Sequence, residues 1–120
     1  MAEGDGLRKD AVLAVEGVGQ ACVVKLAGEL DLYNAPQVRQ ALTEATADSP
    51  QRIVVDLSQV EFIDSTALGV LIEARTKLNN RRAFLLAAPG LETRRALEIS
   101  GLDRHFTVHA SVSEALLAKV

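Results

Sequence analysis

Aromatic residues are scarce in this chain of 120 residues, which has no tryptophan, one tyrosine and three phenylalanines. A surface that stacks the bases of single-stranded nucleic acid on aromatic rings is therefore not expected. The formal net charge of −3 is spread along the chain and leaves no basic stripe for a phosphate backbone. With so few rings, the core must be built from Val, Leu, Ile and Ala, and we expect no direct nucleic-acid partner.

Cysteine and long apolar runs are also missing. Cys22 is the single cysteine, so no internal disulfide can form, and its apolar neighbours predict a small buried side chain. The sequence contains no run of about 18 apolar residues, the length needed to cross a membrane. The acidic, glycine-rich start (MAEGDG) is the opposite of a secretory signal. We expect one domain over residues 1–120, with residues 1–10 flexible, in a reducing cytoplasm and without membrane insertion.

Hydrophobic periodicity predicts that strands and helices alternate along the chain. Apolar or alternating runs predict strands at residues 11–15, 20–26, 53–57, 83–88 and 106–109, with a turn at 17–19 and connections at 27–33 and 58–63. Helical spacing predicts helices between the candidate N-cap Asn34 and Asp48, and at residues 65–78, 91–99 and 111–119. The order ββαβαβαβα predicts an α/β fold with a mixed sheet.

The most informative stretch is Phe62–Val70 (FIDSTALGV), where an apolar segment stops and a helix begins. Ser65 or Thr66 could simply be an N-cap, since side-chain oxygens accept the unpaired N–H groups of a first turn. However, Asp64, Ser65 and Thr66 are three cap-type residues in a row, more than one helix start requires. A phosphate on Ser65 would also suit the positive end of the helix dipole. The stretch is therefore typical of a switch.

Two further sets of residues are candidates for partner contacts. The helix after Ser65 has a core face that consists of Ala67, Val70, Leu71, Ala74 and Leu78. Leu68 and Ile72 lie to one side of that face. The broad apolar arc that results indicates either deep burial of the helix or a surface that a partner covers. Glu29 and Asp31 follow the second predicted strand. They are either solvated charges on a loop, with Asp31 capping a turn, or an acidic edge that pairs with cations of a partner.

The sequence gives little support for catalysis. A nucleophilic Ser65 would need a base within reach and commonly a G-x-S-x-G elbow, but Ile63 and Ala67 stand where the glycines would be. The two histidines, His105 and His109, lie near the last predicted strand and make a poor metal site without further ligands. Glycine-rich phosphate loops are also missing. We therefore predict no catalytic residues, no metal and no cofactor.

A phosphoacceptor aspartate of the response-regulator type was the remaining catalytic possibility, because Asp56 ends a predicted buried strand. Such a site binds Mg²⁺ through further carboxylates. The chain offers only Glu16 and Gly17 after the first strand, and His109 and Ala110 after the last, where a receiver has an acidic pair and a lysine. This hypothesis lacks its partner residues.

Taken together, these motifs resemble the STAS-domain family, specifically the bacterial anti-sigma factor antagonists. The resemblance covers most of the chain and rests on the blocks LAGELD (Leu26–Asp31), VVDL (Val54–Leu57) and FIDSTALGV, with a weaker match in LEISGL (Leu97–Leu102). It implies a single STAS-like domain whose mixed sheet has helices packed mainly on one face. Many members have Gly where this chain has Ala67, a difference of one methyl group.

The resemblance also implies a role for each matching residue. Ser65 would be phosphorylated by a serine kinase of the histidine-kinase-like ATPase fold that is also the anti-sigma factor. The unphosphorylated protein would bind this kinase and free the sigma factor, and a PP2C-type phosphatase would reset the phosphorylated one. The partner-binding residues would be Glu29, Asp31, Asp64, Thr66, Leu68 and Ile72.

The resemblance to the STAS-domain family also allows two other functions. Small STAS proteins also resemble subunits of lipid-transport ABC complexes, and others resemble scaffold subunits of large stress-signalling assemblies. The retained Asp64-Ser65-Thr66 triplet and the polar N-terminus favour the antagonist. The sequence does not specify the sigma factor, the kinase or the signal.

Overall fold

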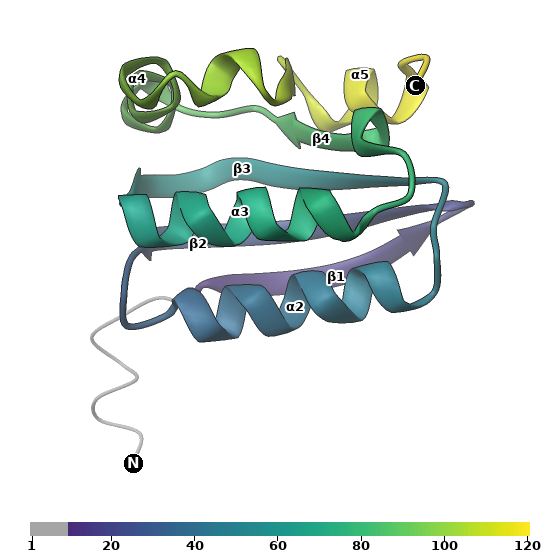
Figure 1. Cartoon of the computed structure of the whole chain (residues 1–120), viewed down its shortest axis with the longest axis horizontal. Coiled ribbons are helices and arrows are strands. Elements are labelled where there is room, and N and C mark those ends of the chain that lie inside the picture. The colour runs from purple at the N-terminus through teal and green to yellow at the C-terminus, as the bar shows by residue number, and fades with distance from the viewer. Residues whose placement is uncertain (1–9) are drawn as a thin grey trace.

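The computed structural model describes residues 10–120, which form an α/β domain with a mixed sheet, as the sequence predicts (Figure 1). Of the segment 1–10 that we expected to be flexible, all but Asp10 lies outside the described residues. The strands are β1 (Val12–Val18), β2 (Ala21–Leu30), β3 (Arg52–Ile63), β4 (Phe84–Ala87) and β5 (Thr107–His109). The α-helices are α2 (Ala35–Ala47), α3 (Ser65–Lys77), α4 (Leu91–Ser100) and α5 (Val112–Leu117). Two short 3-10 helices, η1 (Arg81–Ala83) and η2 (Leu102–Arg104), precede β4 and β5.

The five strands lie in the sheet in the order of the chain, β1-β2-β3-β4-β5. Only the β1–β2 hairpin is antiparallel, and the other three pairings are parallel. Parallel neighbours require crossover connections, which α2, α3 and α4 provide. In consequence the carboxyl ends of β2, β3, β4 and β5 meet at one edge of the sheet.

The core lies on both faces of the sheet, and the two faces are unequal. The larger cluster joins alternate strand residues such as Val24, Val55 and Leu86 to the buried faces of α2, α3 and α4. The smaller cluster joins Val54 and neighbouring strand residues to Ala115 of α5. The central strands are therefore apolar on both sides, as expected of parallel strands. The expectation that helices pack mainly on one face is confirmed.

The strands that lead to the Ser65 helix are longer than the sequence pattern indicates. Residues 58–63, predicted to be a connection, belong to β3, and residues 27–30 belong to β2. The register between these strands shifts after Lys25 and again after Gly28, whose φ is +76°. Each shift interrupts the alternation of buried and exposed residues by which a strand is recognised in a sequence. The pattern therefore predicted strands that ended too early.

The hairpin turn also differs from the prediction. Gly17 and Val18 continue β1, and the turn consists of Gly19 and Gln20. Gly19 has a φ of +61°, a backbone conformation that glycine adopts without a steric cost. Gly17 pairs with Cys22 across the hairpin. Cys22 packs against the core cluster but is only partly buried, so the prediction of a buried side chain is wrong.

Candidate functional site

The start of α3 is capped by an aspartate. Asp64 is the N-cap residue, and its Oδ1 accepts a hydrogen bond of 3.0 Å from the backbone N–H of Ala67. The cap is therefore neither of the two hydroxyl residues that we considered for it. Ser65 and Thr66 occupy the first two helical positions, and both are exposed. Among residues 10–120, neither hydroxyl forms a hydrogen bond.

The backbone at this position favours an added anion. The N–H groups of Ser65 and Thr66 have no acceptor within the helix, because the first intrahelical bond runs from Leu68 N–H to Asp64 O. The helix has 13 residues, so the partial positive charge of its dipole lies at Ser65. A phosphate on the Ser65 hydroxyl would meet this charge on one side and the Asp64 carboxylate on the other.

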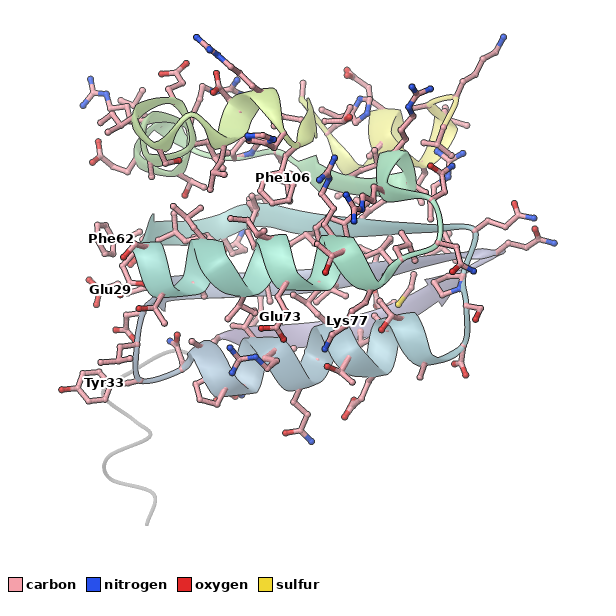
Figure 2. All side chains as sticks on the ribbon, in the orientation of Figure 1. Glu29, Tyr33, Phe62, Glu73, Lys77 and Phe106 are labelled. Atoms are coloured by element: carbon pink, nitrogen blue, oxygen red, sulfur yellow. The ribbon has the colours of Figure 1, made fainter. Side chains whose placement is uncertain are left out.

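The fold brings the two acidic candidates of the second strand to the same end of the molecule. Asp64 N–H donates a hydrogen bond of 3.0 Å to Leu30 O, which ties the start of α3 to the end of β2. In the parallel register, Glu29 pairs with Phe62. We call this region the Ser65 end; it consists of Glu29–Asn34 and Phe62–Thr66. In Figure 2, Glu29 and Phe62 lie together beside the first turn of α3.

Glu29 and Asp31 have different roles within the Ser65 end. Glu29 lies on β2 rather than on a loop as expected, and its side chain is exposed. Asp31 is partly buried, and its Oδ1 accepts hydrogen bonds from the N–H groups of Tyr33 (3.0 Å) and Asn34 (3.3 Å). The alternative that Asp31 caps a turn is thus confirmed. Its carboxylate organises the loop that supports this surface.

Asn34 completes the loop. It is the N-cap residue of α2, as predicted, but its side chain forms no capping hydrogen bond to that helix. Instead, Asn34 Oδ1 accepts from Asp31 N–H at 2.9 Å, and Asn34 Nδ2 donates to Glu29 O at 2.7 Å. The loop between β2 and α2 is therefore held by four hydrogen bonds to or from two side chains.

The two apolar candidates on α3 separate into one buried and one exposed residue. Leu68 is 6% exposed and belongs to the core cluster, so the prediction that it lies on an open face is wrong. The helix packs against α2 and its buried residues join the core cluster on the sheet, so the part of its apolar arc that contains Leu68 is covered. Ile72 is 38% exposed. It follows Ser65 by seven residues, which is roughly 10 Å along the helix axis.

Three exposed apolar residues of the Ser65 end were not predicted from the sequence. Leu32 is 64% exposed, Tyr33 is 83% exposed and Phe62 is 48% exposed. In Figure 2, Glu29 lies between Phe62 and Tyr33 along this end of the molecule. The scarcity of aromatic residues was the signal that could have indicated Tyr33 and Phe62, because Tyr33 lies two residues after the LAGELD block and Phe62 opens the FIDSTALGV block.

The opposite end of the sheet has a cavity of about 550 Å³ between the hairpin and the end of α2. Cys22, Glu44 and Asp48 are among its lining residues. Burial raises the pKa of the Cys22 thiol, and the nearby charge of Asp48 raises it further. The thiol is therefore protonated at neutral pH and a weak nucleophile.

Residues 10–120 contain no group of three or more metal-ligating side chains that could hold an ion. In the same part of the chain, every helix is too short or too polar to cross a bilayer.

Comparison with known proteins identifies the family. The profile of the STAS domain matches residues 12–115, which is most of the chain. The anti-sigma-F factor antagonist RsfB of Mycobacterium tuberculosis is 36% identical over 94 residues, covering 78% of this chain and 77% of that protein. The anti-sigma-B factor antagonist of Staphylococcus aureus is 35% identical over 80 residues, covering 66% and 74%.

The solved structures agree. The crystal structure of an anti-sigma factor antagonist from Mycobacterium paratuberculosis superimposes with a TM-score of 0.82 at 37% identity, covering 89% of this chain and 92% of that one. The chain therefore belongs to the STAS-domain family, and the relatives it resembles are bacterial anti-sigma factor antagonists.

Proposed function

We propose that this protein is an anti-sigma factor antagonist whose binding is switched off by phosphorylation of Ser65. In the unphosphorylated state it binds a cognate anti-sigma serine kinase of the histidine-kinase-like ATPase fold in the bacterial cytoplasm and so frees the sigma factor. Phosphorylation by that kinase abolishes binding, and a PP2C-type phosphatase restores it. The observation that carries the proposal is the exposed hydroxyl of Ser65, which has no hydrogen bond within residues 10–120 and directly follows an N-cap supplied by Asp64.

The geometry explains how a phosphate would act without unfolding the helix. Phosphorylation adds about −1.5 to −2 charges at neutral pH. Because Asp64 supplies the cap, the first turn of α3 keeps its hydrogen bond when the Ser65 hydroxyl is modified. The new charge lies beside the carboxylates of Asp64 and Glu29. A kinase surface that fits the neutral hydroxyl then meets a bulky, strongly solvated dianion, and the complex dissociates.

The other partner-binding residues surround Ser65 on the proposed interface. Thr66 is exposed at the next helical position, and Ile72 lies two turns further along α3. Glu29 offers an exposed carboxylate from β2, while Asp31 supports the loop beside it. Leu68 is buried in the core, so it holds α3 in place but does not contact the partner.

Two Ser65 variants test the proposal. The full chain is mixed with each purified anti-sigma kinase of the source bacterium, and binding is measured by calorimetry with ADP and then with ATP. Ser65→Ala should bind the cognate kinase and stay bound with ATP, because no hydroxyl is available for transfer. Ser65→Asp should bind at least about 100-fold more weakly, because a charge buried in an interface without a partner costs several kcal/mol.

Thr66→Ala is the matched control, because it removes the neighbouring exposed hydroxyl and should still be phosphorylated and released. Mass spectrometry of the ATP reaction should place one phosphate on Ser65. Tight binding of Ser65→Asp, or a phosphate on another residue, would contradict the proposal.

A further inference from the structure

The four aromatic residues divide into two pairs with different surroundings. Phe84 and Phe106 are buried, and their ring centroids lie 6.0 Å apart in the core. Tyr33 and Phe62 are exposed, and both belong to the Ser65 end (Figure 2). Exposed rings offer a large apolar area that a partner can cover, and Tyr and Phe are enriched in the centres of protein interfaces. Half of the aromatic residues of the molecule are thus placed beside the proposed phosphorylation site.

The backbone fixes the position of Phe62. The residue lies near the end of β3 and pairs with Glu29 of β2, and the hydrogen bond from Asp64 N–H to Leu30 O closes the end of this pairing. Phe62 precedes Ser65 by only three residues. Its ring is therefore held at the rim of the site by two paired strands rather than by a free loop.

The backbone around Tyr33 is also fixed, although the residue lies in a loop. Tyr33 N–H donates to Asp31 Oδ1 at 3.0 Å. The side chain of Asn34, at the end of the loop, bonds back to Asp31 N–H and Glu29 O at its beginning. A tyrosine has only two side-chain torsions to order, so a ring on such a loop loses little entropy when a partner covers it. Leu32, also exposed, extends the apolar surface beside Tyr33.

We propose that Tyr33 and Phe62 are the apolar anchors with which the unphosphorylated protein holds its anti-sigma kinase, and that Glu29 between them pairs with a cationic side chain of the kinase. This inference rests on the proposed function. Phosphoryl transfer brings the kinase to within about 3–3.5 Å of the attacking Ser65 hydroxyl. A specific interface covers about 800 Å² on each partner, so it must extend from Ser65 over its immediate neighbours.

The chemistry of this surface defines the matching surface of the kinase. Two exposed rings require an apolar cleft, and the exposed Glu29 carboxylate requires an Arg or Lys at its edge. Because the anchors are independent of the Ser65 hydroxyl, they provide affinity in the unphosphorylated state, and the phosphate must overcome them to release the kinase. Anchors and switch are therefore separate groups on one surface.

The test uses the full chain and the purified kinase that the Ser65→Ala protein binds. Tyr33→Ala and Phe62→Ala should each raise the Kd measured by calorimetry with ADP by roughly 30-fold, the size typical of a central aromatic anchor. Leu117→Ala is the matched control. Leu117 is 85% exposed on α5, away from the Ser65 end, and its loss should change Kd by less than about twofold.

Two further variants separate anchoring from folding and charge. Tyr33→Phe should keep the affinity of the unmodified protein, since the ring is retained. Glu29→Gln should weaken binding at low salt by about five- to tenfold and by less at high salt, because salt screens an exposed charge pair. Circular dichroism melts should show that all these variants fold like the unmodified protein.

The outcomes distinguish this inference from the proposed function. If the unmodified protein binds and Ser65→Asp does not, but Tyr33→Ala and Phe62→Ala bind within twofold of the unmodified protein, the anchors are refuted and the switch stands. If Ser65→Asp binds as tightly as the unmodified protein, or no kinase binds, both are refuted. If sedimentation shows that Tyr33→Ala dissociates a dimer while the affinity for the kinase is unchanged, the surface joins two copies of this chain and the inference is wrong.

Discussion

At the scale of single residues, two neighbouring residues have different roles: Asp64 caps α3, and Ser65 offers the hydroxyl for modification. The carboxylate of Asp64 caps α3, and the hydroxyl of Ser65 remains exposed and unbonded among the described residues. If Ser65 were the cap, a phosphate would remove the hydrogen bond that starts the helix. The observed division lets a modification change the charge of the surface while the helix keeps its first turn.

Replacing the cap residue should reveal this division in a stability measurement. Asp64→Ala removes the acceptor for Ala67 N–H and should lower the free energy of unfolding by about 1 kcal/mol, within the usual range of roughly 0.5–2 kcal/mol. Urea denaturation measures the change. Asp64→Asn is the matched control, because asparagine caps a helix about as well and should leave the stability nearly unchanged. Equal stability of the Ala and Asn variants would show that the capping bond contributes nothing.

At the scale of secondary-structure elements, α3 is attached to α2 by a small cluster of charges. Arg39 Nε of α2 lies 3.2 Å from Glu73 Oε2 of α3, and Lys77 Nζ lies 3.4 Å from the same oxygen. Figure 2 shows Glu73 and Lys77 between the two helices. Partial desolvation raises the pKa of Glu73, but Arg39 and Lys77 lower it by more, so the pKa lies below its ordinary value of 4.5. Glu73 and Lys77 lie on the same helix as Ser65.

This cluster makes part of the stability dependent on pH. A carboxyl whose pKa is lowered by folding stabilises the native state above its ordinary pKa, and the contribution is lost as the pH falls through the lowered value. At pH 7 the urea concentration at the unfolding midpoint should therefore be higher for the unmodified protein than for Glu73→Gln. The difference should be small because the ion pair between Arg39 and Glu73 is exposed to solvent. The difference should shrink below pH 4.5 and vanish in strong acid. A difference that stays constant with pH would contradict the role of the Glu73 charge.

Arg39→Gln serves as the control for the same cluster. It leaves the ion pair between Lys77 and Glu73 in place and should reduce the pH dependence without abolishing it.

At the scale of the whole molecule, the parallel sheet determines where the site is. The carboxyl ends of β2 and β3 lie side by side, so the loop after β2 and the helix after β3 begin at the same edge. Ligands of open α/β sheets bind outside the carboxyl ends of the strands for the same reason. Elements that are distant in sequence thereby provide one continuous surface on a rigid base.

A rigid base predicts that the switch leaves the fold unchanged. Ser65→Asp imitates part of the phosphate charge. The helix dipole stabilises this charge in the folded protein, and repulsion from the neighbouring Asp64 carboxylate destabilises it. Its free energy of unfolding should therefore stay within about 0.5 kcal/mol of the unmodified protein, and hydrogen exchange of α3 should be the same. Loss of protection in α3 would show that modification melts the helix and that the switch is conformational.

Much of the fold could be predicted from the sequence because its signals are local. The order of elements, the start of α3 and the core face of that helix follow from spacing and cap-type residues. All five predicted core positions, of which the last is the C-cap of α3, are buried: Ala67, Val70, Leu71, Ala74 and Leu78. The strand lengths could not be predicted in the same way. The register shifts near Lys25 and Gly28 break the local alternation, and only the pairing with a distant strand extends β2 and β3.

The candidate site divides along the same line. The sequence by itself determined that an Asp, a Ser and a Thr stand at a helix start and that Ile63 and Ala67 replace the glycines of a nucleophile elbow, because these properties depend on neighbouring residues. Only the tertiary structure decided which of the three is the cap, that Leu68 is buried, and that Glu29, Tyr33 and Phe62 lie at the same end of the molecule as the start of α3 (Figure 2). The reason is that burial and adjacency arise from contacts between strands and helices far apart in the chain, which a local pattern does not contain.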